Sequence, residues 1–243
     1  MTLLEAIDIR ISRRKYLDVP VDEAAAQKIS GWIAQYKKDG GVDFRLVLND
    51  GAAFDGFLKS YGMLSGVKNY VGLIADGKDK HSQEKIGYYG ELLVLNMTAI
   101  GLGTCWVGGS FDRKSCPFVL SDSEKIACTV AFGYVDDNLG KKENFIRNMT
   151  HRKSKTVNDM LISDDPALPE WLLDGMRAVE KAPSAVNRQP VKFSYQKGVV
   201  TAGVDNFDGD GFAADLGIAK AHFDIAAGGR FGFGNNAEFV KNK

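Results

Sequence analysis

Three stretches of the chain carry residues whose types and spacing could do chemistry. The first, residues 10–15, reads RISRRK and places four cations and one hydroxyl within six positions. Guanidinium groups bind phosphate through paired charged hydrogen bonds, and a serine hydroxyl can add one more. The stretch therefore predicts a phosphate-binding element. The alternative is a solvated basic turn at a helix end, where cations interact favourably with the helix dipole.

The second stretch, residues 182–190, reads APSAVNRQP and lies between a predicted helix and a predicted strand. Its two prolines stiffen the connector. Ser184, Asn187 and Gln189 can present hydrogen-bond donors and acceptors to the edge of a planar heterocycle. The alternative is that serine and asparagine only cap helix ends and turns at this place.

The third stretch, residues 101–109, reads GLGTCWVGG and follows a predicted helix. Gly108 and Gly109 would let backbone N–H groups approach a ligand closely. The pattern is not the G-x-G-x-x-G fingerprint and does not follow a strand, so it does not support a Rossmann nicotinamide site. A helix C-cap followed by a tight turn explains Gly101 or Gly103, but it does not require the second glycine pair.

Composition excludes several classes of protein. The chain has 243 residues, 44% hydrophobic and 26% charged, which is enough apolar material for one large domain or two small ones. The formal net charge is zero, which gives no indication of a nucleic-acid partner. Cys105, Cys116 and Cys128 lack C-x-x-C spacing and the three histidines lack metal-ligand spacing. Neither a disulfide framework nor a metal site is therefore expected.

The N-terminal residues include acids early and no apolar segment of the kind found in secretory signals. No uninterrupted apolar run reaches the roughly 18–20 residues that a membrane span needs. Three reduced thiols fit a reducing compartment. We therefore expect a cytoplasmic protein without a membrane partner.

Apolar periodicity predicts the elements that must position the three stretches. Helices are predicted over residues 2–11, 23–37, 82–100, 167–181 and 212–227. Strands are predicted over residues 44–49, 69–76, 125–134, 191–195 and 199–203. Residues 137–165 are expected to form a polar basic loop, and residues 228–243 a glycine-rich tail that only packs or frays. His222 is expected to be a hydrogen-bonded core or interface residue.

The order helix, connector, strand, helix occurs twice along the chain. The segments ELLVLNMTAIGLG and DLGIAKAHFDIAAGG have similar apolar spacing. The sequence therefore predicts two structurally related halves, residues 1–160 and residues 161–243.

Taken together, the three stretches resemble motifs of the nitroreductase family. Arg10, Ser12 and Arg14 match its R-x-S-x-R phosphate element, and residues 101–109 match its G-L-G-T-C-W-x-G-G stretch. Residues 183–190 resemble its P-S-x-x-N-x-Q-P element, and residues 153–155 resemble its second phosphate contact, K-x-K/R. The resemblance assigns cofactor binding to Arg10, Ile11, Ser12, Arg14, Val107, Gly108, Gly109, Lys153, Lys155, Pro183, Ser184, Ala185, Asn187 and Gln189.

The position of one motif departs from the family pattern. In the family, two subunits interlock, and one supplies the phosphate arginines while the other supplies the P-S-x-x-N element. That element follows the first long helix in ordinary members, whereas here it comes only after residue 180. The chain therefore resembles a single-chain version of the dimer with one complete flavin site. Its expected oligomeric state is a monomer (pseudo-dimer) or a homodimer. The implied fold is α+β and nitroreductase-like, with a central, mostly antiparallel sheet flanked by helices and two related halves.

The resemblance implies an FMN-dependent oxidoreductase that transfers hydride from NAD(P)H, through the flavin, to an electron-poor small molecule such as a nitroaromatic or a quinone. The two phosphate elements would hold the FMN phosphate. Ser184, Asn187 and Gln189 would contact the isoalloxazine edge, and backbone N–H groups around residues 107–109 would lie near its N5 atom. No catalytic side chain is assigned.

Two alternatives stay open. A flavoenzyme of the same fold could catalyse dehalogenation or dehydrogenation, with lid residues supplied by residues 50–68 or 136–150. A non-catalytic flavin-binding protein would hold a flavin that neither NADH nor NADPH reduces.

Overall fold

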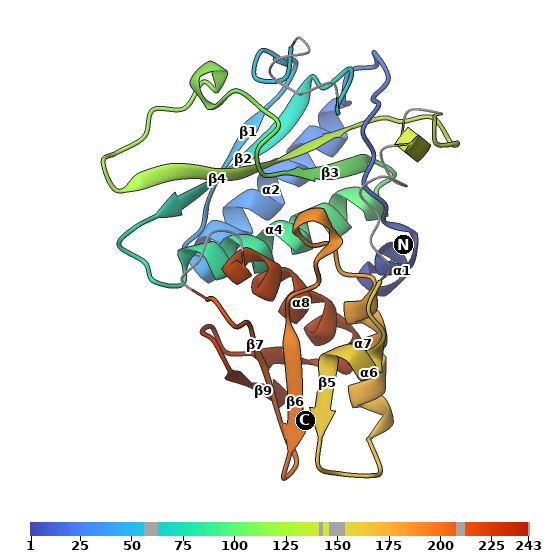
Figure 1. The fold of residues 1–243 in the computed structure, drawn as a ribbon. Coiled ribbons are helices and arrows are strands. Elements are labelled where there is room, and N and C mark those ends of the chain that lie inside the picture. The colour runs from blue at the N-terminus through green and yellow to red at the C-terminus, as the bar shows by residue number, and fades with distance from the viewer. Residues whose placement is uncertain (56–62, 141–142, 146–153, 208–211, 243) are drawn as a thin grey trace. The chain divides into compact units, whose positions relative to one another are not determined.

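The computed structural model describes residues 1–55, 63–140, 143–145, 154–207 and 212–242 of the chain (Figure 1). The chain forms two compact units, each with its own sheet. Unit 1 comprises Met1–Asp79 and Leu93–Met149, and unit 2 comprises Lys80–Leu92 and Thr150–Lys243. The helix α4 (Ser82–Ala99) runs through both, because its first part belongs to unit 2 and its last part to unit 1.

Unit 1 is built on a four-stranded antiparallel sheet with the order β1-β2-β4-β3. Its strands are β1 (Asp43–Val47), β2 (Asn69–Asp76), β3 (Gly103–Val107) and β4 (Glu124–Gly133). Seven of the eight residues of β2 are buried, without the alternation of a strand that has one face in water. The central pair β2–β4 therefore forms the middle of the core, and β3 lies at an edge of the sheet.

Capping residues set the ends of the helices of unit 1. These helices are α1 (Leu3–Ile9), α2 (Glu23–Gly40) and the 3-10 turn η1 (Arg113–Ser115). α1 begins with a capping box at Thr2, and α2 begins at Asp22, whose carboxylate accepts a backbone N–H of the first turn. α2 ends at Gly41, whose φ of 67° lies in the left-handed region that favours glycine.

Unit 2 is built on a five-stranded sheet with the order β5-β6-β7-β9-β8, in which the pair β5–β6 is parallel and the other pairs are antiparallel. Its strands are β5 (Leu161–Ser163), β6 (Lys192–Gln196), β7 (Val199–Gly203), β8 (Gly229–Phe231) and β9 (Ala237–Lys241). Its helices are α6 (Val157–Met160), α7 (Glu170–Glu180), the 3-10 turn η2 (Ala185–Asn187) and α8 (Phe212–Ala227). Four phenylalanines of its core have ring centroids 5.0 to 6.0 Å apart: Phe193, Phe223, Phe231 and Phe239.

α8 is largely buried and carries charged side chains that are paired inside unit 2. Nζ of Lys220 lies 2.5 Å from Oε1 of Glu84, and Nε2 of His222 lies 2.9 Å from Oε1 of Glu91. Both acids come from the first part of α4. Because a buried charge is costly unless it is paired, these contacts specify how α8 packs on that part of α4. The expectation that His222 is a hydrogen-bonded core residue is confirmed.

Most predicted elements are observed with slightly shifted ends, one strand was not predicted, and two local expectations are wrong. The strand that was not predicted is β3, which residues 103–107 of the third stretch form. α6 and β5 lie inside the segment predicted as a basic loop, and the tail expected to fray contributes β8 and β9. β3, β5 and β9 each pair with a predicted strand, namely β4, β6 and β7. Such pairing with another segment stabilises a strand without leaving a periodic pattern in its own sequence.

The two compact units are each discontinuous in sequence, so they do not test the predicted division into residues 1–160 and 161–243. The structural relationship between those two halves stays a prediction. Of the candidate lid segments 50–68 and 136–150, residues 56–62, 141–142 and 146–150 lie outside the described residues.

Candidate functional site

Residues 10–17, which include the first stretch, form an extended segment of unit 1 that follows α1, here called the strap. Ser12 makes a parallel β-bridge with Thr104 of β3, and the N–H of Arg13 donates to the carbonyl of Thr104 at 2.8 Å. The buried Tyr16 hydroxyl lies 3.1 Å from the carbonyl oxygen of Ala131 on β4. The strap is therefore fixed by backbone and side-chain hydrogen bonds to the two strands at one edge of the sheet.

The cations of the strap have different environments. Arg13 is buried, and its guanidinium contacts the buried carboxylate of Glu143 at 3.4 Å. Arg10 and Arg14 instead lie close enough to the Cys105 thiol to act on its pKa, which burial raises and which these two arginines and a hydrogen bond with Ser12 lower. The structure therefore places Ser12 against a cysteine of the third stretch, on whose thiol the charges of Arg10 and Arg14 also act.

Gly108 and Gly109 follow β3 and are exposed. An added Cβ at either position would have no heavy atom within 4 Å, so packing within the described residues does not require glycine there. Local structure explains the earlier glycines, Gly101 and Gly103. Gly101 has a φ of 89°, in the left-handed region that favours glycine, and a Cβ at Gly103 would lie 2.4 Å from Val135. The open space beside Gly108 and Gly109 would let a ligand approach the backbone closely.

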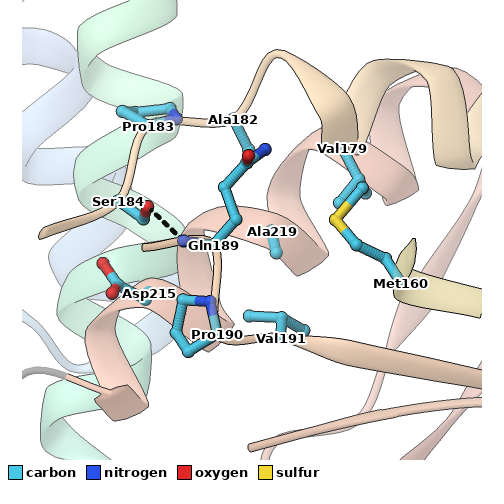
Figure 2. A pocket seen from close by; sticks show the side chains of 10 residues that line it. All are labelled: Met160, Val179, Ala182, Pro183, Ser184, Gln189, Pro190, Val191, Asp215 and Ala219. Atoms are coloured by element: carbon cyan, nitrogen blue, oxygen red, sulfur yellow. Dashed lines mark hydrogen bonds between the residues drawn. The ribbon is translucent and has the colours of Figure 1, made fainter. Parts of the chain in front are cut away.

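The second stretch is a connector between α7 and β6 in unit 2 whose ends are held by hydrogen bonds. The hydroxyl of Ser184 accepts the N–H of Gln189 at 2.8 Å (Figure 2). The side-chain amide of Gln189 donates to the carbonyl of Glu180 at 3.1 Å and accepts the N–H of Lys155 at 2.8 Å. The ammonium of Lys155 donates to the carbonyl of Gln189 at 2.8 Å.

These contacts bring Lys155 and Gln189 together, although the resemblance assigns one to the FMN phosphate and the other to the isoalloxazine. Gln189 is buried, and both ends of its amide are used inside the protein. The structure thus gives Gln189 and Lys155 a role in holding the connector, and their contact with a flavin stays a prediction. Lys153 lies outside the described residues.

The middle of the connector has a backbone conformation that ordinary residues avoid. Val186, Asn187 and Gln189 have φ values of 48°, 52° and 44°. Left-handed φ is unfavourable for a β-branched residue and costs about 1–3 kcal/mol unless the surroundings impose it. Val186 is 52% exposed, so its side chain gains little from packing in return. Strain of this kind is concentrated at ligand-binding segments.

Asp215, in the first turn of α8, holds the start of the connector. Its carboxylate accepts the N–H of Ala185 at 3.0 Å. Burial raises the pKa of Asp215 to about 7, and the hydrogen bond from Ala185 and the charge of Arg188 oppose that rise. Asp215 also lines a small cavity of about 10 Å³ with Pro183, Ser184, Gln189 and Pro190 (Figure 2). That volume holds about one water molecule, so a planar ring has no room inside it.

Other classes of site find no support in the described parts of the chain. No three His, Cys, Asp or Glu side chains among the described residues come together as metal ligands would. In the same residues, no helix is long and apolar enough to cross a membrane. The three cysteines are free thiols.

Comparison with known proteins identifies the family. The family model described as "Putative TM nitroreductase" matches residues 2–227, which is nearly the whole chain, so the chain belongs to this nitroreductase family. A crystal structure described as a "putative nitroreductase" from Thermotoga maritima is similar over 98% of this chain and 92% of that chain, with a TM-score of 0.67 and 22% sequence identity. The predicted α+β, nitroreductase-like fold is confirmed, with its strands distributed over two sheets.

More distant similarities extend to shorter chains. An FMN-dependent nitroreductase from Clostridium difficile matches 61% of this chain and 97% of its own, with 18% identity and a TM-score of 0.44. A nitroreductase family protein from Clostridium novyi matches 56% of this chain and 87% of its own, with 18% identity and a TM-score of 0.45. A search of curated proteins found no match.

Sequence reasoning missed two acids that hold the candidate site residues. Glu143 binds the strap from a position 129 residues beyond Arg14, and nothing in its neighbourhood in the sequence indicates that contact. Asp215 carried a weak signal, because it is an acid at the start of an otherwise apolar helix pattern.

Proposed function

We propose that this protein is an FMN-dependent oxidoreductase that uses NADH or NADPH to reduce an electron-poor small molecule, such as a nitroaromatic or a quinone. Bound FMN would supply the hydride transfer, and the protein would bind it, orient it and exclude competing reactions. Membership of the nitroreductase family supports the redox chemistry. We further propose that the protein is cytoplasmic and acts as a monomer or a homodimer.

The observation that carries this proposal is the arrangement along β3. Ser12 pairs with Thr104 near one end of the strand, and Gly108 follows the other end. Thr104 and Gly108 are four positions apart, about 13 Å at the usual rise of a strand. A molecule with a phosphate at one end and a planar ring at the other can bridge such a separation. β3 would thus hold the phosphate element and the open glycine pair at a fixed spacing.

Each group of residues would contribute a different part of the binding energy. Arg10, Ser12 and Arg14 would bind the phosphate through charge-assisted hydrogen bonds, which are roughly twice as strong as neutral ones. Backbone N–H groups of residues 107–109 would donate to the ring system and favour its reduced, anionic form. The remaining assignments stay proposals: Ile11, Lys153, Lys155, Pro183, Ser184, Ala185, Asn187 and Gln189.

Asn187 is the connector residue best suited to direct contact with a flavin. It belongs to the strained, partly exposed middle of the connector, and Ser184 and Gln189 hold the ends of the connector. The hydrogen bonds at the ends would keep the side chain of Asn187 in one orientation. We propose no catalytic side chain for the reduction itself.

Titration of the purified protein with FMN, followed by a count of released flavin, tests the proposal. We expect one FMN per chain, with absorption bands near ~370 and ~450 nm. Arg10→Ala and Asn187→Ala should each weaken binding by about tenfold or more, since hydrogen bonds to charged or buried groups contribute about 1.5–3 kcal/mol. Lys28→Ala, which removes an exposed cation from α2, is the charge-matched control and should bind as the wild type does.

The outcomes separate the alternatives. Two FMN molecules per chain would contradict the single site, and no binding at all would remove the redox proposal. Anaerobic addition of NADH or NADPH should bleach the flavin bands of the bound protein. A bound flavin that neither nucleotide bleaches would favour the non-catalytic flavin-binding alternative.

A further inference from the structure

Glu143 is a buried acid whose carboxylate accepts hydrogen bonds from the strap. Its Oε1 accepts the N–H of Arg14 at 2.6 Å and the N–H of Lys15 at 3.1 Å. Its Oε2 accepts the N–H of Gly140 at 3.2 Å. The guanidinium of Arg13 contacts the same carboxylate through Nε at 3.4 Å and Nη2 at 3.5 Å. Three backbone donors and one cation therefore meet on a single carboxylate.

These contacts compensate the cost of burying a charge. Glu143 is 3% exposed, and burial alone would raise its pKa. The backbone N–H groups and the Arg13 guanidinium outweigh that effect and hold the pKa of Glu143 below its usual range. Glu143 is therefore an ionised group that the surrounding donors fix in one place.

The contacts also place the Arg13 side chain apart from the Ser12 side chain. Successive side chains of an extended segment leave on opposite sides. Arg13 leaves towards Glu143, whereas the Ser12 hydroxyl hydrogen-bonds with the Cys105 thiol and the Arg14 guanidinium lies 3.4 Å from the carbonyl oxygen of Ser12. Glu143 neutralises Arg13 and fixes the backbone at Arg14, so the arrangement of the R-x-S-x-R side chains depends on an acid that does not belong to the motif.

We propose that Glu143 is a positioning residue for the phosphate element. It would hold the strap in the conformation in which Arg10, Ser12 and Arg14 bind the phosphate, without touching the ligand itself. This inference rests on the proposed function, because it takes the FMN phosphate as the ligand of those three residues.

The test compares FMN with riboflavin, which has the same ring system and no phosphate. Glu143→Gln keeps the size of the side chain but removes the charge that binds Arg13 and the N–H groups. We expect FMN affinity to fall about tenfold, as for the loss of charge-assisted hydrogen bonds, and riboflavin affinity to stay unchanged. Asp136→Asn is the matched control, because Asp136 lies 3.8 Å from the Lys15 ammonium and is 55% exposed. That variant should bind both flavins as the wild type does.

Amide hydrogen exchange in the flavin-free protein gives a second readout that does not depend on the proposed function. The N–H groups of Arg14 and Lys15 should exchange at least about tenfold faster in Glu143→Gln than in the wild type. If the wild type binds no flavin, the proposed function fails. The exchange rates of the Arg14 and Lys15 amides in the two proteins still show whether Glu143 orders the strap. Unchanged exchange together with unchanged FMN affinity would overturn the inference.

A second variant covers the case in which Glu143→Gln does not fold. Glu143→Asp keeps the charge, but its side chain is shorter by one methylene, so its carboxylate lies farther from the strap. It should weaken FMN binding by a smaller factor than Glu143→Gln, again without an effect on riboflavin. Equal weakening of both flavins would contradict a role specific to the phosphate element.

Discussion

Two buried carboxyl groups of α8 have pKa values far above that of an ordinary aspartate. Burial raises the pKa of Asp215 to about 7 and that of Asp224 also to about 7. The opposing hydrogen bonds come from Ala185 in the first case, and from the Tyr88 hydroxyl and the Phe231 N–H in the second. Both groups therefore change charge near neutral pH, where an ordinary aspartate is already ionised.

The sign of the resulting pH dependence follows from the raised pKa. The folded protein binds the Asp215 proton more tightly than the unfolded chain, whose aspartate keeps the ordinary value of 3.8. The stabilisation is therefore complete below about pH 4 and is lost as the pH rises through about 7. Asp215→Asn imitates the protonated form and can still accept the N–H of Ala185. It should be more stable than the wild type by about 1–3 kcal/mol at pH 8 and nearly equal to it at pH 4.

Urea unfolding at pH 4, 6 and 8 checks this prediction. Asp205→Asn is the control, because Asp205 is 82% exposed and forms only a surface ion pair with Lys192 among the described contacts. It should leave the pH dependence of the unfolding free energy unchanged. A wild type and an Asp215→Asn variant with parallel pH profiles would show that this carboxyl group is not the source of the effect.

At this scale, the sequence indicates candidate site residues where they are neighbours in the chain. Arg10, Ser12 and Arg14 were predicted as a group in this way, and their binding of a phosphate stays a prediction. Glu143 was not found, because hydrogen bonds across 129 positions have no local signature. The internal role of Gln189 was also missed, since an amide has the same donors and acceptors whether it faces a ligand or the protein.

Among the elements, the crossing of α4 and α8 in unit 2 depends on glycine. A Cβ added at Gly217 would lie 1.9 Å from the carbonyl oxygen of Glu84, and one at Gly87 would lie 2.0 Å from the carbonyl oxygen of Ala214. Both obstacles are backbone atoms, which cannot move aside as a side chain can. The two helices therefore approach each other as closely as their backbones permit.

Gly217→Ala should separate the helices and lower the free energy of unfolding by about 1–3 kcal/mol or more. Gly31→Ala in α2 is the matched control, since its added Cβ meets nothing within 4 Å. In that helix interior, alanine should stabilise the protein by about 0.5–1 kcal/mol. Thermal unfolding of both variants checks the prediction, and equal melting temperatures for the two would contradict it.

Helices and strands were predictable where one segment of the sequence contains both the apolar pattern of the element and the residues that end it. The strand Asn69–Asp76 and the helix Phe212–Ala227 were predicted with their observed ends, because each is a mostly apolar segment bounded by polar or glycine residues. β8 was missed because glycines surround its three residues and its single buried side chain, Phe231, packs into a core assembled from the rest of unit 2. Tertiary packing there outweighs local propensity.

For the molecule as a whole, the shared helix α4 predicts coupled unfolding. Its first turns supply partners for buried groups of unit 2, and its last turns belong to unit 1. Loss of one unit would therefore leave part of this helix without its packing. Trp171 of unit 2, stacked on Phe239, and Trp32 and Trp106 of unit 1 provide separate fluorescence probes.

Variants that retain Trp171 alone, or Trp32 alone, should unfold in urea with coincident midpoints and equal cooperativity. Circular dichroism of the same variants serves as the control, because it follows all helices at once. Midpoints that differ by more than about 0.5 M urea would mean that the units unfold independently despite the helix they share.

The discontinuity of the units also limits how this chain can be divided or recombined. Unit 2 contains residues 80–92, which lie inside the sequence of unit 1. A gene cut at any single codon before that of Lys220 would separate Glu84 from Lys220, or would cut unit 1 itself. Recombination between relatives can therefore exchange unit 2 as a working module only if the first turns of α4 are inherited with it. The interleaving ties the evolution of the two units together.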